Sequence, residues 1–221
     1  MSDRAGTSTD VAGSAARSGD ARVAERLPDL DALVAAHDAD TQDRLGPAIA
    51  AGRASHDVER RAALERYAVA KWTTAELPLL IANAPDVYRF TMEDSTHYRH
   101  WAERFASQAG YLREPNHVQA ALDACRALSL DDAAIRAYVP LPETIAMTCT
   151  VLFYLRRSYE EGLAVLAYGG DRIGLPADPE AVGLVGLVAT TPAARARCRD
   201  ALRNVLATVA CRVRAMNRWV E

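Results

Sequence analysis

The residues with the clearest chemical potential lie in one stretch, Tyr88 to Leu112. Within it Glu93, His97, His100 and Arg104 are spaced at i, i+4, i+7 and i+11. In an α-helix these positions fall within about 60° of one another, so a carboxylate, two imidazoles and a guanidinium would form one row. The row is either a solvated helix edge or one wall of a pocket.

The same row has the spacing of metal ligands. A carboxylate and imidazoles three or four positions apart on a helix can bind one ion, and the ligands here would be Glu93, His97 and His100. The alternative is a polar helix edge, where a Glu–His pair contributes only a few tenths of a kcal/mol. Spacing alone leaves both interpretations open.

A second group of candidates precedes this stretch. Lys71 and Glu76 flank Trp72 in an otherwise apolar helical segment. A partly buried lysine can act as a base because burial lowers its pKa. The alternative is that its stem packs on the core while the ammonium group reaches water.

Three further residues are candidates on chemical type. Cys149 lies between two threonines in an apolar segment and is either a nucleophile or a small buried hydrophobe. Tyr67 and Tyr154 are expected to form walls of a binding pocket rather than to catalyse.

Helical periodicity positions these candidates, and no strand-like alternation persists anywhere in the chain. The segment from Glu143 to Tyr168 is apolar on all sides, which predicts a central, enclosed helix ended by Gly169-Gly170. Ser129 resembles the first residue of a capping box. The chain is therefore predicted to be all-α, with seven or eight helices. The predicted helices are Asp29–Ala51, Ser55–Asn83, Tyr88–Leu112, His117–Leu128, Ser129–Tyr138, Glu143–Tyr168, Glu180–Ala189 and Pro192–Trp219.

Bulk properties limit the classes of function. A chain of 221 residues, half of them apolar, can form one domain, predicted over 29–221 after a disordered tail at 1–28. A net charge of −3 and scattered arginines argue against nucleic-acid or membrane partners. The four cysteines are not paired at metal-ligand spacing and no signal peptide is evident, so we expect free, buried thiols and a cytoplasmic location.

Several motifs together resemble a known group of helical proteins. They are ELPLLIANAPD followed by MEDSTHYRHWAERFASQAG, the run IAMTCTVLFYL, and a last segment that begins TTPAARARCRD. This order is similar to the haem-oxygenase-like superfamily, which includes pyrroloquinoline-quinone synthase, the TenA thiaminases and non-haem di-iron oxidases. The resemblance covers about residues 30 to 220 and implies a single-domain bundle that forms a homodimer.

Departures from this pattern shape what the resemblance implies. Di-iron members carry a glutamate on the central helix, where this chain has Thr148, Cys149 and Thr150, and no histidine follows His117. The resemblance therefore implies that the set of metal ligands is incomplete and that the protein holds no cofactor. Iron is the metal that a complete site of this kind would bind. The TenA group carries a nucleophilic cysteine on that helix, and Cys149 matches it, although threonine replaces the usual preceding proline.

The resemblance and the candidates together predict a small-molecule tailoring enzyme of a biosynthetic pathway. It would carry out oxidative or acid–base chemistry in a pocket between helices. Two alternatives remain: an iron-dependent oxygenase with a carboxylate-rich site, and a non-catalytic ligand-binding or partner protein. The predicted catalytic residues are Glu93, His100, Cys149 and Lys71. The predicted substrate-binding residues are Tyr67, Trp72, Glu76, His97, Arg104 and Tyr154.

Overall fold

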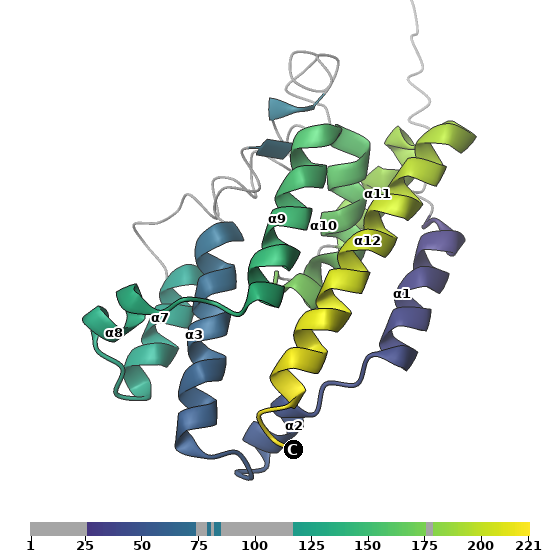
Figure 1. Cartoon of the computed structure of the whole chain (residues 1–221). Helices are drawn as coiled ribbons and strands as arrows, with labels where there is room; N and C mark the ends of the chain where they lie inside the picture. Colours follow the sequence, from purple (N-terminus) through teal and green to yellow (C-terminus); the bar gives the residue numbers. More distant parts are fainter. Residues whose placement is uncertain (1–25, 74–78, 81, 85–116, 176–178) are drawn as a thin grey trace, which may run out of the picture.

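The chain is helical throughout the part that the structure, a computed structural model, describes: residues 26–73, 79–80, 82–84, 117–175 and 179–221 (Figure 1). These residues contain nine helices and no strand, which confirms the all-α prediction but exceeds the predicted seven or eight helices. The predicted Tyr88–Leu112 helix lies outside the described residues. The described helices are α1 (Pro28–Asp40), α2 (Leu45–Ala50), α3 (His56–Thr73), α7 (His117–Ala127), α8 (Asp132–Ala137), α9 (Pro142–Arg157), α10 (Tyr159–Ile173), α11 (Pro179–Val188) and α12 (Pro192–Asn217).

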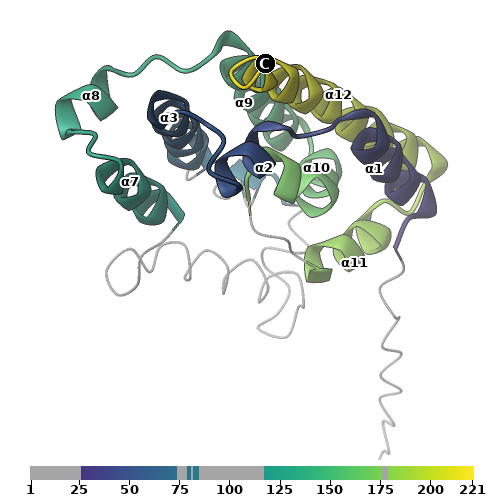
Figure 2. The same ribbon diagram turned by 90° about the horizontal axis from the view of Figure 1, so that it is seen from below.

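Helix α10 is the innermost element. It packs against α9, α11, α12 and, less extensively, α1 (Figure 2). Every residue from Tyr159 to Gly170 is buried except Glu160 and Ala167, which are half-buried. This helix is the centre of the larger of two hydrophobic clusters.

The predicted central helix is in fact two helices. Ser158 has an extended backbone, with φ −154° and ψ 157°, and its hydroxyl oxygen accepts a hydrogen bond from the Glu161 amide at 3.2 Å. It therefore ends α9 and begins α10 as an N-cap. The expected stop at Gly169-Gly170 is wrong: both glycines lie inside α10, which ends at Gly174 with φ +89°.

The expectation of an enclosed helix applies to α10 but not to α9. Phe153 on α9 is 55% exposed and Ile145 is 39% exposed. The apolar run in the sequence therefore supplies both a core face and an outward face. Uniform hydrophobicity alone did not distinguish the two.

Two further helix boundaries differ from the prediction. The predicted Asp29–Ala51 helix is interrupted after Asp40, because Asp43 and Asn217 bind the backbone amides at the start of α2. Helix α8 is capped by Asp131, whose carboxylate accepts a hydrogen bond from the Ala134 amide at 2.7 Å. Ser129, the predicted cap, instead lies in the turn before it with φ +60°.

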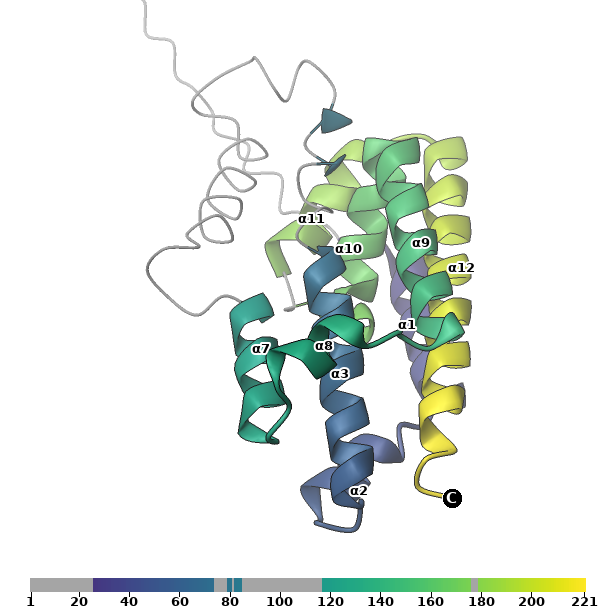
Figure 3. The same cartoon turned by 60° about the vertical axis from the view of Figure 1, so that its left-hand side comes forward.

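A second, smaller hydrophobic cluster joins α3, α7 and α8 (Figure 3). Its buried members are Ala63, Leu64, Cys125, Leu130 and Ile135. Val69, also on α3, belongs to the larger cluster. Helix α3 therefore bridges the two parts of the fold, and α7 packs on its outer side.

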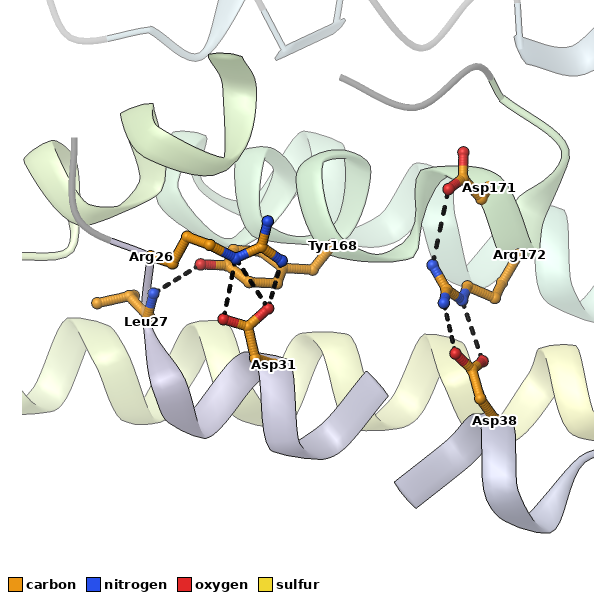
Figure 4. A network of polar contacts seen from close by, with 7 residues as sticks. All are labelled: Arg26, Leu27, Asp31, Asp38, Tyr168, Asp171 and Arg172. Carbon is orange, nitrogen blue, oxygen red and sulfur yellow. Dashed lines mark hydrogen bonds and ion pairs between the residues drawn. The ribbon is translucent and has the colours of Figure 1, made fainter. Parts of the chain in front are cut away.

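Helix α1 is attached to α10 by polar contacts at both of its ends (Figure 4). The Leu27 amide donates a hydrogen bond to the Tyr168 hydroxyl at 2.8 Å, and Arg26 pairs with Asp31 above the Tyr168 ring. At the other end Arg172 binds both carboxylate oxygens of Asp38. The Tyr168 contact is buried, whereas the two ion pairs are partly exposed.

Gly162 provides a test of the packing around α10. An alanine Cβ at this position would lie 2.9 Å from Leu80 Cδ1 and 3.0 Å from the Leu155 Cα. Because the Leu155 atom is backbone, we expect Gly162→Ala to lower the free energy of unfolding by roughly 1–3 kcal/mol in urea titrations followed by circular dichroism.

Gly169→Ala is the matched control on the same helix. Its Cβ would lie 3.4 Å from Leu202 Cδ1, an ordinary contact. The gain in helix propensity of up to about 1 kcal/mol should then leave this variant as stable as the wild type or more so. Equal stability of the two variants would contradict the close approach described at Gly162.

Candidate functional site

Glu65 is a completely buried carboxylate at the contact between α3 and α9. It accepts hydrogen bonds from the Tyr138 hydroxyl at 2.5 Å and from the Leu141 amide at 2.7 Å. The Thr144 hydroxyl donates a third, to the other carboxylate oxygen. Burial and this neighbouring carboxylate raise the pKa of Tyr138 well above that of an ordinary tyrosine, which keeps its hydroxyl a donor.

Arg212 of α12 extends this network. Its Nε donates to the Thr144 hydroxyl oxygen at 3.1 Å, so Thr144 lies between a guanidinium and the Glu65 carboxylate. Burial lowers the pKa of Arg212, and the negative charge of Glu65 acts in the opposite direction. Three helices and the segment before α9 are thus joined by one chain of hydrogen bonds.

A cavity of about 350 Å³ opens beside this network, between α3, α7, the end of α10 and α12. Ala63, Val69 and Ile173 form a buried apolar part of its wall. The charged groups among its described lining residues are three guanidinium groups and one carboxylate. These charged residues are Arg66, Arg172, Arg212 and Asp171.

The three arginines differ in how far their charge is neutralised. Arg172 binds Asp38 through two hydrogen bonds and lies 3.8 Å from an Asp171 carboxylate oxygen (Figure 4). These contacts raise the pKa of Arg172 and lower the pKa of Asp38. Arg66 makes no hydrogen bond or ion pair with any described residue, although it is exposed on the cavity wall.

A second buried carboxylate, Glu161, lies where α9, α10 and α12 meet. It is 3.4 Å from Arg157 Nε and 3.8 Å from Arg197 Nε. Its Oε2 accepts no hydrogen bond from a described residue, although it is the oxygen that pairs with Arg157. Both arginines are exposed, so this cluster connects a buried acid to the surface rather than to the cavity.

The structure describes five of the ten predicted site residues. Tyr67 packs against the smaller hydrophobic cluster, and Tyr154 is buried with its hydroxyl accepting a hydrogen bond from Asn204 at 2.6 Å. Lys71, Trp72 and Cys149 are exposed, Trp72 to 43%. None of the five lines the cavity.

The other five predicted site residues lie outside the described part of the chain: Glu76, Glu93, His97, His100 and Arg104. Their roles in catalysis, substrate binding and metal binding therefore stay predictions. Within the described residues, no group of three or more His, Cys, Asp or Glu side chains could hold a metal ion.

Sequence reasoning did not single out the charged residues of the network and cavity. Glu65 follows Ala62-Ala63-Leu64, and Arg212 lies between Cys211 and Val213, so both interrupt apolar segments. A charge within an apolar helical segment was the available signal, because such a group must find a partner when it is buried. Treating the arginines as scattered surface residues overlooked it.

Comparison with known proteins assigns no family. No protein-family model matches the chain, and no curated protein matches it. None of the helices in the described ranges is long and apolar enough to cross a membrane.

The exposure of the four cysteine side chains can be tested directly. All four are free, but the expectation that all are buried is wrong, since Cys149 and Cys211 are exposed. Burial raises the pKa of Cys198 to about 12, which disfavours its thiolate. In the native protein a thiol reagent should therefore label Cys149 and Cys211 rapidly, and peptide mass spectrometry should find Cys125 and Cys198 unmodified until denaturant is added.

The Asp38–Arg172 pair predicts a small acid-dependent contribution to stability. The pKa of Asp38 is lower in the folded protein than in the unfolded chain. This contribution is therefore present above about pH 3.9, the ordinary aspartate pKa, and is lost as the pH falls through the pKa of folded Asp38. The Asp38 side chain is 47% exposed, so solvent screening limits the effect to less than about 1 kcal/mol. Asp38→Asn should lower the unfolding midpoint at neutral pH and converge with the wild type in strong acid. A difference that persists in acid would show that it does not arise from the carboxylate charge.

Proposed function

We propose that the protein is a small-molecule tailoring enzyme, built on a haem-oxygenase-like bundle, that binds its substrate in the cavity between α3, α7, α10 and α12. The cavity carries the proposal. Its volume of about 350 Å³ is within the range of ligand sites, and its wall combines small apolar side chains with a few charged groups.

The support for the bundle type is the sequence resemblance together with an all-α packing around one buried helix. The sequence predicted a pocket between the Tyr88, Ser55 and Glu143 helices. The cavity shares with that prediction α3 and the end of α10, and it is also lined by α7 and Arg212. In this proposal Glu93 or His100 accepts a proton from the substrate, while the cavity orients it and limits contact with water.

The binding part of the proposal can be tested by filling the cavity. Ala124 on α7 lines it, whereas Ala120 on the same helix is exposed and does not. A library of metabolites is screened by thermal shift against the wild type and against Ala124→Trp and Ala120→Trp. Compounds that stabilise the wild type and Ala120→Trp should fail to stabilise Ala124→Trp. If Ala124→Trp responds like the wild type, the cavity is not the binding site.

The catalytic part needs a separate measurement. A compound that binds is incubated aerobically with the protein, and its conversion is followed by mass spectrometry. Glu93→Ala and His100→Ala, with folding checked by circular dichroism, should each reduce conversion at least about a hundredfold, the lower range for general acid–base catalysis. Binding without conversion by the wild type would favour the non-catalytic alternative.

A further inference from the structure

We propose that the cavity recognises an oxyanion, a carboxylate or a phosphate group, held between the guanidinium groups of Arg66 and Arg212. This inference rests on the proposed function, because it names the chemical class of ligand for the same cavity.

Arg212 supplies donors that none of the described residues uses. Only its Nε makes a hydrogen bond among the described residues, to the Thr144 hydroxyl at 3.1 Å. A guanidinium also carries N–H donors on both Nη atoms, arranged to meet two oxygens of one anion. Since Arg212 lines the cavity, a ligand there can accept these bonds.

Arg66 supplies a charge without a counterion in the described part of the chain. It lines the same cavity from α3 and lies close enough to Arg212 for the two positive charges to oppose one another. Burial lowers the pKa of Arg212, and the repulsion from Arg66 adds a smaller effect in the same direction. An anion between them would replace the repulsion by two attractions and would compensate the desolvated charge of Arg212.

The remaining charges of the wall do not compete for this role. Arg172 is already bound to Asp38 through both carboxylate oxygens. Among the lining residues that the structure describes, Asp171 is the only carboxylate, and it lies beside Arg172. Within the described part of the wall, Arg66 and Arg212 are thus the two cations that make no direct ion pair.

The rest of the wall limits the body of the ligand. Ala63, Val69, Ala121 and Ile173 present small or buried apolar side chains. A short apolar chain attached to the anion would contact these groups, which favours a small organic acid or a phosphate ester. Free inorganic phosphate would contact the arginines without using the apolar part of the wall.

The experiment titrates the full chain by calorimetry at constant ionic strength with butyrate, with its neutral analogue butyramide and with inorganic phosphate. The wild type should bind butyrate or phosphate at millimolar concentration and bind butyramide at least about tenfold more weakly, because hydrogen bonds to charged groups are the stronger ones. Butyrate binding alone would identify a carboxylate ligand, and phosphate binding alone a phosphate ligand. Failure of the wild type to bind either anion would overturn the proposal.

Variants assign the binding to the two arginines. Arg66→Met should weaken anion binding about tenfold or more. Arg212→Lys keeps the charge but loses the planar set of donors, so it should also weaken binding while circular dichroism confirms folding. Arg136→Met, an exposed position on α8 away from the cavity, is the control and should bind like the wild type.

The outcomes separate this inference from the proposed function. If Ala124→Trp blocks binding but butyrate and butyramide bind equally, the cavity remains the site and the anionic ligand is refuted. If anion binding is unchanged in both Arg66→Met and Arg212→Lys, the assignment to these residues is also refuted. If Ala124→Trp leaves binding intact, the cavity itself fails as the site.

Discussion

The buried carboxylate of Glu65 is the constraint on which the arrangement of the helices depends. Removing a charge from water costs several kcal/mol unless partners replace the lost hydration. Here the partners come from the segment between α8 and α9, from the first turns of α9 and, through Thr144, from α12. Helix α3 can therefore dock only where all of these groups converge, which fixes its position against the bundle more specifically than apolar contacts would.

The same network also prepares the cavity. Thr144 accepts a hydrogen bond from Arg212 Nε, so the Nη donors of that guanidinium take no part in this contact. Arg66 is the residue after Glu65 on α3, so the burial of one determines where the other projects its charge. The positions of Arg66 and Arg212 thus follow from the hydrogen bonds that the buried Glu65 carboxylate requires. Fold and candidate site share one set of hydrogen bonds.

Local signals predicted some elements well and others poorly. The predicted helix starts at Pro192 and Glu143 agree with the start of α12 and, within one residue, with that of α9, because capping and a fixed proline φ act within a few residues. The break at Ser158 and the continuation of α10 through Gly169-Gly170 depend on packing between helices, which overrides propensity. The cavity was not predictable for the same reason: its arginines are separated by more than a hundred residues of sequence, from Arg66 to Arg172 and Arg212.

Among the described residues, helix α7 contributes side chains to the smaller hydrophobic cluster and none to the larger one. Its buried Cys125 belongs to the smaller cluster, and its main packing partner among the described helices is α3. Of the four helices that line the cavity, α7 has the fewest buried residues among those described, and an element with few buried contacts opens at a lower free energy than the global transition. Ala121 and Ala124 would move with it, so this wall of the cavity is the one that local fluctuations expose most often. The rate at which a ligand exchanges with solvent would then depend on local opening of α7 rather than on unfolding of the bundle.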